Sequence, residues 1–114
     1  MDAEVVYELR VYHAYEEKLE ALLARFRDHT MRIFEKHGMR SIAYWIATDE
    51  PLRGKTLIYI LEHKSREAAK ASWRGMASDP EWQAVKSATE ANGKLFEKID
   101  STYMRKTDFS PQLL

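Results

Sequence analysis

The spacing of apolar residues changes along this chain in an order that few folds can accommodate. Strand-like alternation covers residues 4–13, 39–48, 55–63 and 94–105. Helical spacing, with apolar residues every three or four positions, covers residues 16–36 and 65–92. The pattern therefore predicts the order strand, helix, strand, strand, helix, strand.

Capping residues mark where the predicted helices begin and end. Gly38 directly follows the first helical stretch and is expected to end it, because glycine readily adopts the left-handed backbone of helix C-termini. Ser65 is a favourable N-cap for the next helix. Asp79-Pro80 supplies a fresh start, an N-cap followed by proline at the first helical position. We therefore expect the second helical stretch to form two pieces.

Four strands and two helices in this order predict an α+β ferredoxin-like sandwich, with helices over one face of a four-stranded antiparallel sheet. The strands at 39–48 and 55–63 are apolar on both sides, since Ile58 and Ile60 alternate with residues such as Tyr59. This pattern is typical of a sheet covered on both faces. It predicts a homodimer whose two sheets close into an α/β barrel. The alternative is a monomer that exposes surplus apolar residues.

Length and composition limit the classes of protein to which the chain can belong. Its 114 residues suffice for one core, so we expect a single domain over residues 1–114 with a C-terminal tail at 106–114. Lys plus Arg equals Asp plus Glu at 18 each, which argues against a nucleic-acid or membrane partner. The absence of cysteine excludes disulfides and thiolate chemistry. No apolar run reaches the roughly 18 residues of a membrane span, and we expect a cytoplasmic protein.

Three polar residues within apolar patterns are candidates for catalysis. His37 continues the apolar stripe of the first helix, where a neutral imidazole could act as an acid, a base or a metal ligand. Alternatively, it caps the end of that helix beside Gly38. Arg10 and Tyr12 share a strand face with Glu8, and Arg10 is suited to hold a carboxylate ligand. The alternative for Arg10 is an ion pair at the dimer interface, either with Glu8 or with a residue of a neighbouring strand.

The remaining candidates divide between the expected interior and the expected surface. Large aromatic side chains are expected to line a pocket for an apolar or aromatic ligand, with simple core packing as the alternative: Trp45, Tyr59, Trp73 and Trp82. His13 and His63 fall at predicted strand ends and are expected to be solvated. Arg25 belongs to the charge-dense side of the first helix, which we also expect to face water.

The sequence predicts neither a metal site nor a bound cofactor. It contains no glycine-rich phosphate loop, no G-x-S-x-G elbow and no H-E-x-x-H motif. His29 and His37 are eight residues apart on the first helix, too far to share one metal ion. Residues 65–93 contain no histidine, so a haem ligand could come only from His37 or another residue of the first helix.

Five short motifs along the chain carry a family resemblance. In order they are Tyr7-Glu8-Leu9-Arg10-Val11-Tyr12, His37-Gly38-Met39, Tyr44-Trp45, Asp79-Pro80-Glu81-Trp82 and Asp108-Phe109-Ser110-Pro111. Together they resemble the NIPSNAP family, small domains of the dimeric α/β-barrel superfamily. The resemblance implies a ferredoxin-like protomer in a dimeric barrel. Wider relatives in that superfamily include cofactor-independent monooxygenases, muconolactone-type isomerases and haem-degrading enzymes, which is an analogy of fold.

Two hypotheses about function remain open at this point. In the first, a pocket between sheet and helices binds a small apolar or aromatic molecule, with His37, Arg10 and Tyr12 as its polar groups. Any reaction there would be a cofactor-independent oxidation, as in a monooxygenase, or a proton-transfer isomerisation. In the second, the chain is a non-enzymatic dimeric module that binds another protein.

Overall fold

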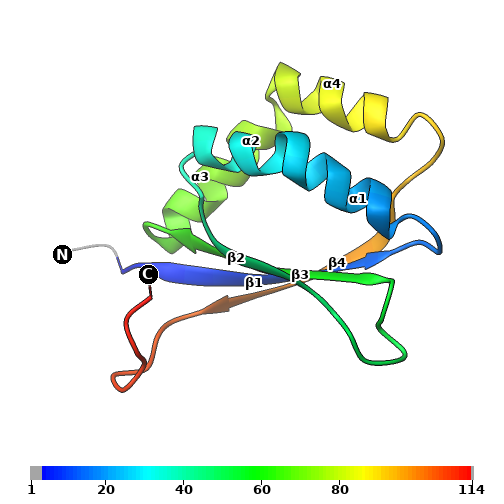
Figure 1. Cartoon of the computed structure of the whole chain (residues 1–114). Helices are drawn as coiled ribbons and strands as arrows, with labels where there is room; N and C mark the ends of the chain where they lie inside the picture. Colours follow the sequence, from blue (N-terminus) through cyan, green and yellow to red (C-terminus); the bar gives the residue numbers. More distant parts are fainter. Residues whose placement is uncertain (1–3, 114) are drawn as a thin grey trace.

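The computed structural model describes residues 4–113; residues 1–3 and Leu114, the ends of the predicted domain, lie outside the described residues. The strands are β1 (Val6–Ala14), β2 (Arg40–Ile46), β3 (Thr56–His63) and β4 (Phe96–Met104). The helices are α1 (Leu19–Arg25), the π-helical segment η1 (Phe26–Thr30), α2 (Met31–Lys36), α3 (Arg66–Ala77) and α4 (Pro80–Thr89). All helices lie on one side of the sheet, and the loop after β2 and the C-terminal tail extend on the other side (Figure 1). The predicted order of strands and helices is confirmed.

The sheet has the strand order β2-β3-β1-β4, with every neighbouring pair antiparallel. The ferredoxin-like α+β fold that the sequence predicts is therefore confirmed. β1 is a central strand, with Arg10 opposite Tyr59 on β3 and Ser101 on β4. Because side chains alternate across a strand, Glu8, Arg10 and Tyr12 all face the helices.

The first helical stretch differs from the regular helix that the sequence predicts. It begins at Leu19, because Glu17 adopts a left-handed backbone with φ 64°, and α1 passes through η1 into α2 without a break. The hydroxyl of Thr30 donates to the carbonyl oxygen of Arg25, 3.3 Å away and five residues earlier. A hydroxyl that donates in this way competes with main-chain amides for the carbonyl oxygen. The main chain here is widened to the five-residue hydrogen bonding that defines a π turn.

The predicted break in the second helical stretch is confirmed. Ser65 caps α3, and its hydroxyl accepts a hydrogen bond of 2.9 Å from the amide of Ala68. Asp79 caps α4, and its carboxylate accepts a hydrogen bond of 2.8 Å from the amide of Glu81, with Pro80 at the first helical position. The chain turns between the two pieces, so that α4 lies over the first helical stretch (Figure 1).

The sheet face away from the helices is largely apolar. Leu9 and Val11 on β1 and Ile58 and Ile60 on β3 are only partly buried there, and Trp45 on β2 is 49% exposed. Tail residues Ser110 and Leu113 lie beside the end of this face, in a groove shared with Ile60. Within residues 4–113, no helix is long and apolar enough to cross a lipid bilayer.

Removing the cap of α3 tests how this helix is held. We expect Ser65→Ala to lower the free energy of unfolding by about 1 kcal/mol, because the amide of Ala68 loses its acceptor. Urea unfolding followed by circular dichroism measures the difference. Ser87→Ala, at an exposed position within α4, is the matched control and should cost nothing. Equal stability of the two variants would contradict the assignment.

Candidate functional site

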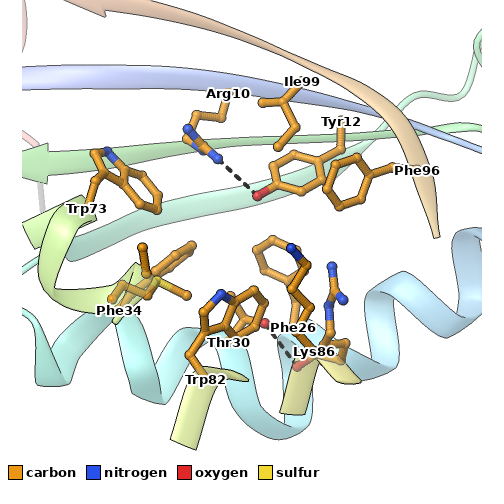
Figure 2. Close-up of a pocket in the computed structure, with 13 residues that line it drawn as sticks. Arg10, Tyr12, Phe26, Thr30, Phe34, Trp73, Trp82, Lys86, Phe96 and Ile99 are labelled. Carbon is orange, nitrogen blue, oxygen red and sulfur yellow. Dashed lines mark hydrogen bonds between the residues drawn. The ribbon is translucent and has the colours of Figure 1, made fainter. Parts of the chain in front are cut away.

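A cavity of about 170 Å³ lies between the sheet and the helices (Figure 2). Strands β1 and β4 provide one wall, while α1, η1, α2, α3 and α4 provide the others. Most of the side chains that line it are aromatic, cationic or aliphatic: Arg10, Tyr12, Arg25, Phe26, Thr30, Phe34, Trp73, Met76, Ala77, Trp82, Lys86, Phe96 and Ile99. In Figure 2, the side chains of Arg10, Tyr12 and Phe96 lie across the space from those of Trp82 and Phe26.

Arg10 is held in one orientation by three hydrogen bonds and by an indole ring against its guanidinium. Its Nε donates to the Tyr59 hydroxyl at 2.8 Å, its Nη2 to the Tyr12 hydroxyl at 3.1 Å, and its Nη1 to Glu8 Oε2 at 3.0 Å. The indole of Trp73 lies against the guanidinium, with 4.2 Å between the ring centroid and Cζ. Although burial lowers the pKa of Arg10, the neighbouring Tyr12, Tyr59 and Glu8 raise it, so the group stays charged.

Glu8 is the carboxylate behind Arg10, and only 1% of its surface is exposed. Besides Arg10, its donors are His63 Nε2 at 2.8 Å, Trp73 Nε1 at 2.9 Å and Ser101 Oγ at 2.7 Å. Burial raises the pKa of Glu8, but these hydrogen bonds and the Arg10 charge outweigh it and lower the pKa to about 2. The ion pair between Arg10 and Glu8 is therefore present, but it faces α3 and not the open sheet face on which a dimer was expected.

The hydroxyl groups of Tyr12 and Tyr59 meet at the same place. Tyr59 is fully buried and donates to the Tyr12 hydroxyl at 3.1 Å, and burial raises the pKa of Tyr59 well above its usual value. Tyr12 oxygen thus accepts from both Tyr59 and Arg10. A phenol has one hydrogen to donate, so the proton of Tyr12 is left for a group inside the cavity.

The sequence predicted that Arg25 faces water on the charged side of the first helix, and this prediction is wrong, because the side chain is buried. Its side chain is 2% exposed, and Nη1 lies 3.2 Å from both Thr89 Oγ1 and Glu90 Oε2. The guanidinium lies 5.2 Å from the ring centroid of Trp82. Arg25 follows Leu22 by three residues and so borders the apolar stripe, where α4 covers it. Its Nε has no hydrogen-bond partner among residues 4–113.

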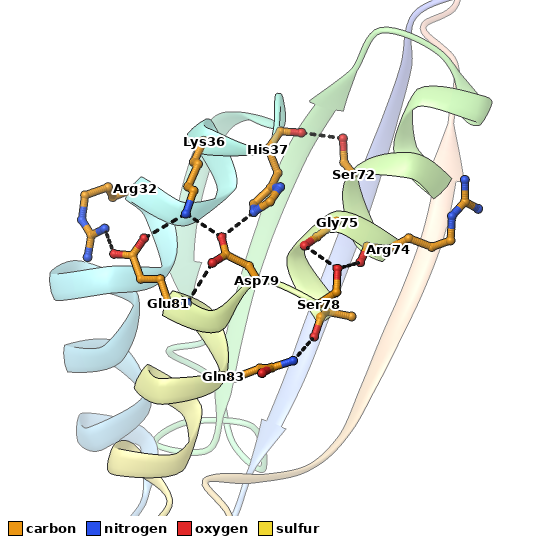
Figure 3. Close-up of polar contacts among 11 residues, drawn as sticks. Arg32, Lys36, His37, Ser72, Arg74, Gly75, Ser78, Asp79, Glu81 and Gln83 are labelled. Atoms are coloured by element: carbon orange, nitrogen blue, oxygen red, sulfur yellow. Dashed lines mark hydrogen bonds and ion pairs between the residues drawn. The ribbon is translucent and has the colours of Figure 1, made fainter.

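His37 does not line the cavity. It is the C-cap residue of α2, and its Nε2 lies 2.7 Å from Asp79 Oδ2, which also pairs with Lys36 Nζ at 2.8 Å (Figure 3). Hydrogen bonds from Lys36 and His37 lower the pKa of Asp79. The ring fits there because Gly75 has no side chain, since a Cβ at that position would lie 3.1 Å from His37 Nδ1. The helix-capping interpretation of His37 therefore describes its position.

The aromatic candidates occupy three different places. Trp73 and Trp82 line the cavity, while Tyr59 lies behind its wall and contacts it through Arg10 and Tyr12. Trp45 faces the other side of the sheet, opposite Ile58. The neighbouring Tyr44 faces the helices instead and stacks on Tyr59, with 5.0 Å between the ring centroids. A strand that is apolar on both sides gives no signal for which of these two rings faces inward.

Sequence reasoning missed the role of His63, which it expected to be solvated. The side chain is fully buried and hydrogen-bonded to Glu8 through Nε2, while Nδ1 has no partner among the described residues. The signal was present, because His63 has the same parity as Leu57, Tyr59 and Leu61 and so continues the helix-facing side of β3. Within residues 4–113, no three histidine or acidic side chains gather as metal ligands.

Fold and cavity together define a small ferredoxin-like α+β protein with an aromatic cavity under its helices. Residues 7–111 match the model of the NIPSNAP family, and the chain therefore belongs to this family. The match spans β1 to the tail, and it confirms the resemblance that the five motifs carry. No curated protein matches this sequence.

Several solved structures share the fold. An uncharacterized NIPSNAP-like domain protein from Burkholderia xenovorans is 18% identical, with a TM-score of 0.81 over 97% of this chain and 92% of that one. A NIPSNAP family protein from Agrobacterium tumefaciens strain C58 is 23% identical, with a TM-score of 0.81 over 95% and 98%. SnoaB, a cofactor-independent oxygenase from Streptomyces nogalater, is 10% identical, with a TM-score of 0.63 over 96% and 100%. At these identities the likeness concerns the fold alone.

The buried carboxylate makes a strong prediction about stability. We expect Glu8→Gln to lower the free energy of unfolding at pH 7 by about 3–5 kcal/mol, because it leaves the Arg10 charge without its carboxylate. The folded pKa of Glu8 lies below its unfolded value, so the contribution is complete above about pH 4.5 and is lost as the pH falls through about 2. The gap between wild type and variant should therefore narrow at pH 3.

Urea unfolding of both proteins at pH 7 and pH 3 measures this gap. Glu97→Gln makes the same substitution at an exposed position of β4 and should change stability by less than about 0.5 kcal/mol. A Glu8→Gln variant as stable as wild type at pH 7, or a gap that widens at pH 3, would contradict the role given to Glu8.

Proposed function

We propose that this protein binds a small aromatic or apolar molecule in the cavity between the sheet and the helices. The observation that carries the proposal is a cavity of about 170 Å³ walled by aromatic rings, with a partly buried and fixed guanidinium at one side. Ligand sites are typically concave, mainly apolar and equipped with a few well-placed polar groups. Arg10 and Tyr12 are those polar groups here.

Chemistry at this site is the finer part of the proposal. Arg10 and Tyr12 are hydrogen-bond donors that could stabilise negative charge as it develops on a substrate oxygen. Such stabilisation suits a cofactor-independent oxidation, with molecular oxygen as the oxidant, or a proton-transfer isomerisation. The fold shared with SnoaB, described as a cofactor-independent oxygenase, is compatible with the first. Oxygen consumption upon addition of a bound molecule distinguishes the two.

Tryptophan fluorescence can report binding directly, because Trp73 and Trp82 line the cavity. A Trp45→Phe background removes the third tryptophan, which lies on the other sheet face. We expect titration with single-ring aromatic probes (toluene, benzoate) to change this fluorescence saturably.

Filling the cavity should abolish the signal. Ile99→Phe adds bulk to the cavity wall without adding a tryptophan, and we expect it to weaken probe binding at least tenfold. Ile46→Phe makes the same change at an exposed strand position outside the cavity and should bind the probes as the background does. If no probe binds at all, the proposal fails and the alternative of a non-enzymatic protein-interaction module gains support.

We also propose that a second copy of the chain covers the open sheet face. The centre of this face is apolar along β1 and β3, and Trp45 exposes half of its surface there. Charged residues lie toward the edge, where His13 pairs with Asp100 at 2.8 Å. Two such faces are self-complementary about a twofold axis, which is the usual geometry of homodimers. The sequence resemblance to a dimeric barrel superfamily points the same way.

Light scattering coupled to size exclusion measures this assembly. We expect a mass of about twice the 13.4 kDa of one chain for the wild type. Trp45→Arg places a charge in the apolar face and should shift the protein toward monomer. Met31→Arg is the matched control, because Met31 is an exposed apolar residue of the helical layer. A wild-type monomer at micromolar concentration would refute the proposed dimer.

A further inference from the structure

The charged side chains that line the cavity are all cationic. Three cationic side chains line it, Arg10, Arg25 and Lys86, and no carboxylate does. Glu8 pairs with Arg10 and Glu90 with Arg25 from behind the wall, and Lys86 has no ion pair within residues 4–113. Among these five groups, three cations against two carboxylates leave one positive charge, that of the exposed Lys86, which favours an anionic guest.

Hydrogen-bond donors remain available on the sheet wall. A guanidinium has five N–H groups, and Arg10 uses three of them, toward Tyr59, Tyr12 and Glu8. Among residues 4–113, no acceptor is therefore assigned to two N–H groups of Arg10 or to the hydroxyl proton of Tyr12. A carboxylate has two oxygens, so it can accept from Arg10 and from Tyr12 at the same time.

Arg25 places a second guanidinium on the cavity wall. Its side chain is 98% buried, since 2% is exposed, and it lines the cavity between α4 and β4. Its Nε has no hydrogen-bond partner among the described residues, although a buried unpaired donor is costly. The charge of Arg25 adds to the attraction of the cavity for a negatively charged molecule.

The size of the cavity limits how large the guest can be. Its volume of about 170 Å³ is close to that of an engineered apolar cavity of roughly 150 Å³ that binds benzene. The rings of Phe34, Trp82 and Phe96 offer faces and edges for one aromatic ring. A fused polycyclic molecule would need more space than the walls leave.

We propose that the ligand is a single-ring aromatic carboxylate, with its ring among the aromatic walls and its carboxylate on Arg10 and Tyr12. This inference rests on the proposed small-molecule function and names the class of molecule. Arg10 supplies charge and two N–H groups, Tyr12 supplies the O–H, and Glu8 keeps Arg10 in place as a positioning residue.

Three probes distinguish the contribution of the ligand's negative charge to binding from that of its aromatic ring. Benzoate has both, benzamide has the ring without the charge, and acetate has the charge without the ring. We expect isothermal titration calorimetry of the full-length protein at pH 7 to give a Kd for benzoate at least tenfold below that for benzamide, with acetate weakest. Raising the salt concentration should weaken benzoate and leave benzamide unchanged.

Tyr12→Phe tests the anchor, because it removes one hydroxyl and keeps the ring that packs against Phe26 and Phe96. We expect it to weaken benzoate about tenfold and to leave benzamide binding within about twofold. Tyr15→Phe is the matched control, since Tyr15 is exposed and does not line the cavity. If Tyr12→Phe does not fold, the three-probe comparison on wild type still decides the ligand class.

The outcomes distinguish this inference from the function on which it rests. Equal affinity for benzoate and benzamide would overturn the carboxylate and leave aromatic binding intact. Loss of benzoate preference in Arg25→Gln, with Tyr12→Phe unaffected, would overturn Arg10 and Tyr12 as the anchor. If neither aromatic probe binds, both the inference and the proposed function fail.

Discussion

The buried ion pair between Glu8 and Arg10 constrains the rest of the structure. Removing a charge from water costs several kcal/mol, so both groups must be surrounded by partners. The donors to Glu8 besides Arg10 come from β3, α3 and β4: His63, Trp73 and Ser101. These partners fix α3 on the sheet. They also turn the other side of Arg10 toward Tyr12, so the polar wall of the cavity follows from satisfying one buried pair.

The space in front of that wall exists because the helices depart from regularity twice. The π turn over Phe26–Thr30 widens the first helical stretch, and both of its end residues line the cavity. The break at Asp79-Pro80 sends α4 across the first stretch and brings Trp82 over the cavity (Figures 1 and 2). Two regular helices packed flat on the sheet would leave less room, since interiors pack densely.

Local rules predicted most of the fold and only part of the site. Alternation placed Glu8, Arg10 and Tyr12 on one strand face, and capping residues located the helix break. When a strand is apolar on both sides, alternation does not show which side faces the helices. Trp45 was therefore expected in the interior, but it lies on the other face of the sheet. The burial of Arg25 depends on α4, a segment more than fifty residues away, and no local pattern contains that contact.

His37 belongs to the cavity indirectly, through the helix that closes it. Within Pro80–Thr89 no residue is fully buried, and α4 is held by the packing of Trp82 and Val85 on the core together with polar contacts at its two ends. At its start, Asp79 is held by Lys36 and His37; at its end, Thr89 and Glu90 are held by Arg25. Trp82 lies in α4 between these two sets of contacts, so the ion pairs at both ends of the helix help to position this wall of the cavity. A histidine that the sequence suggested for catalysis thus helps to place an aromatic wall.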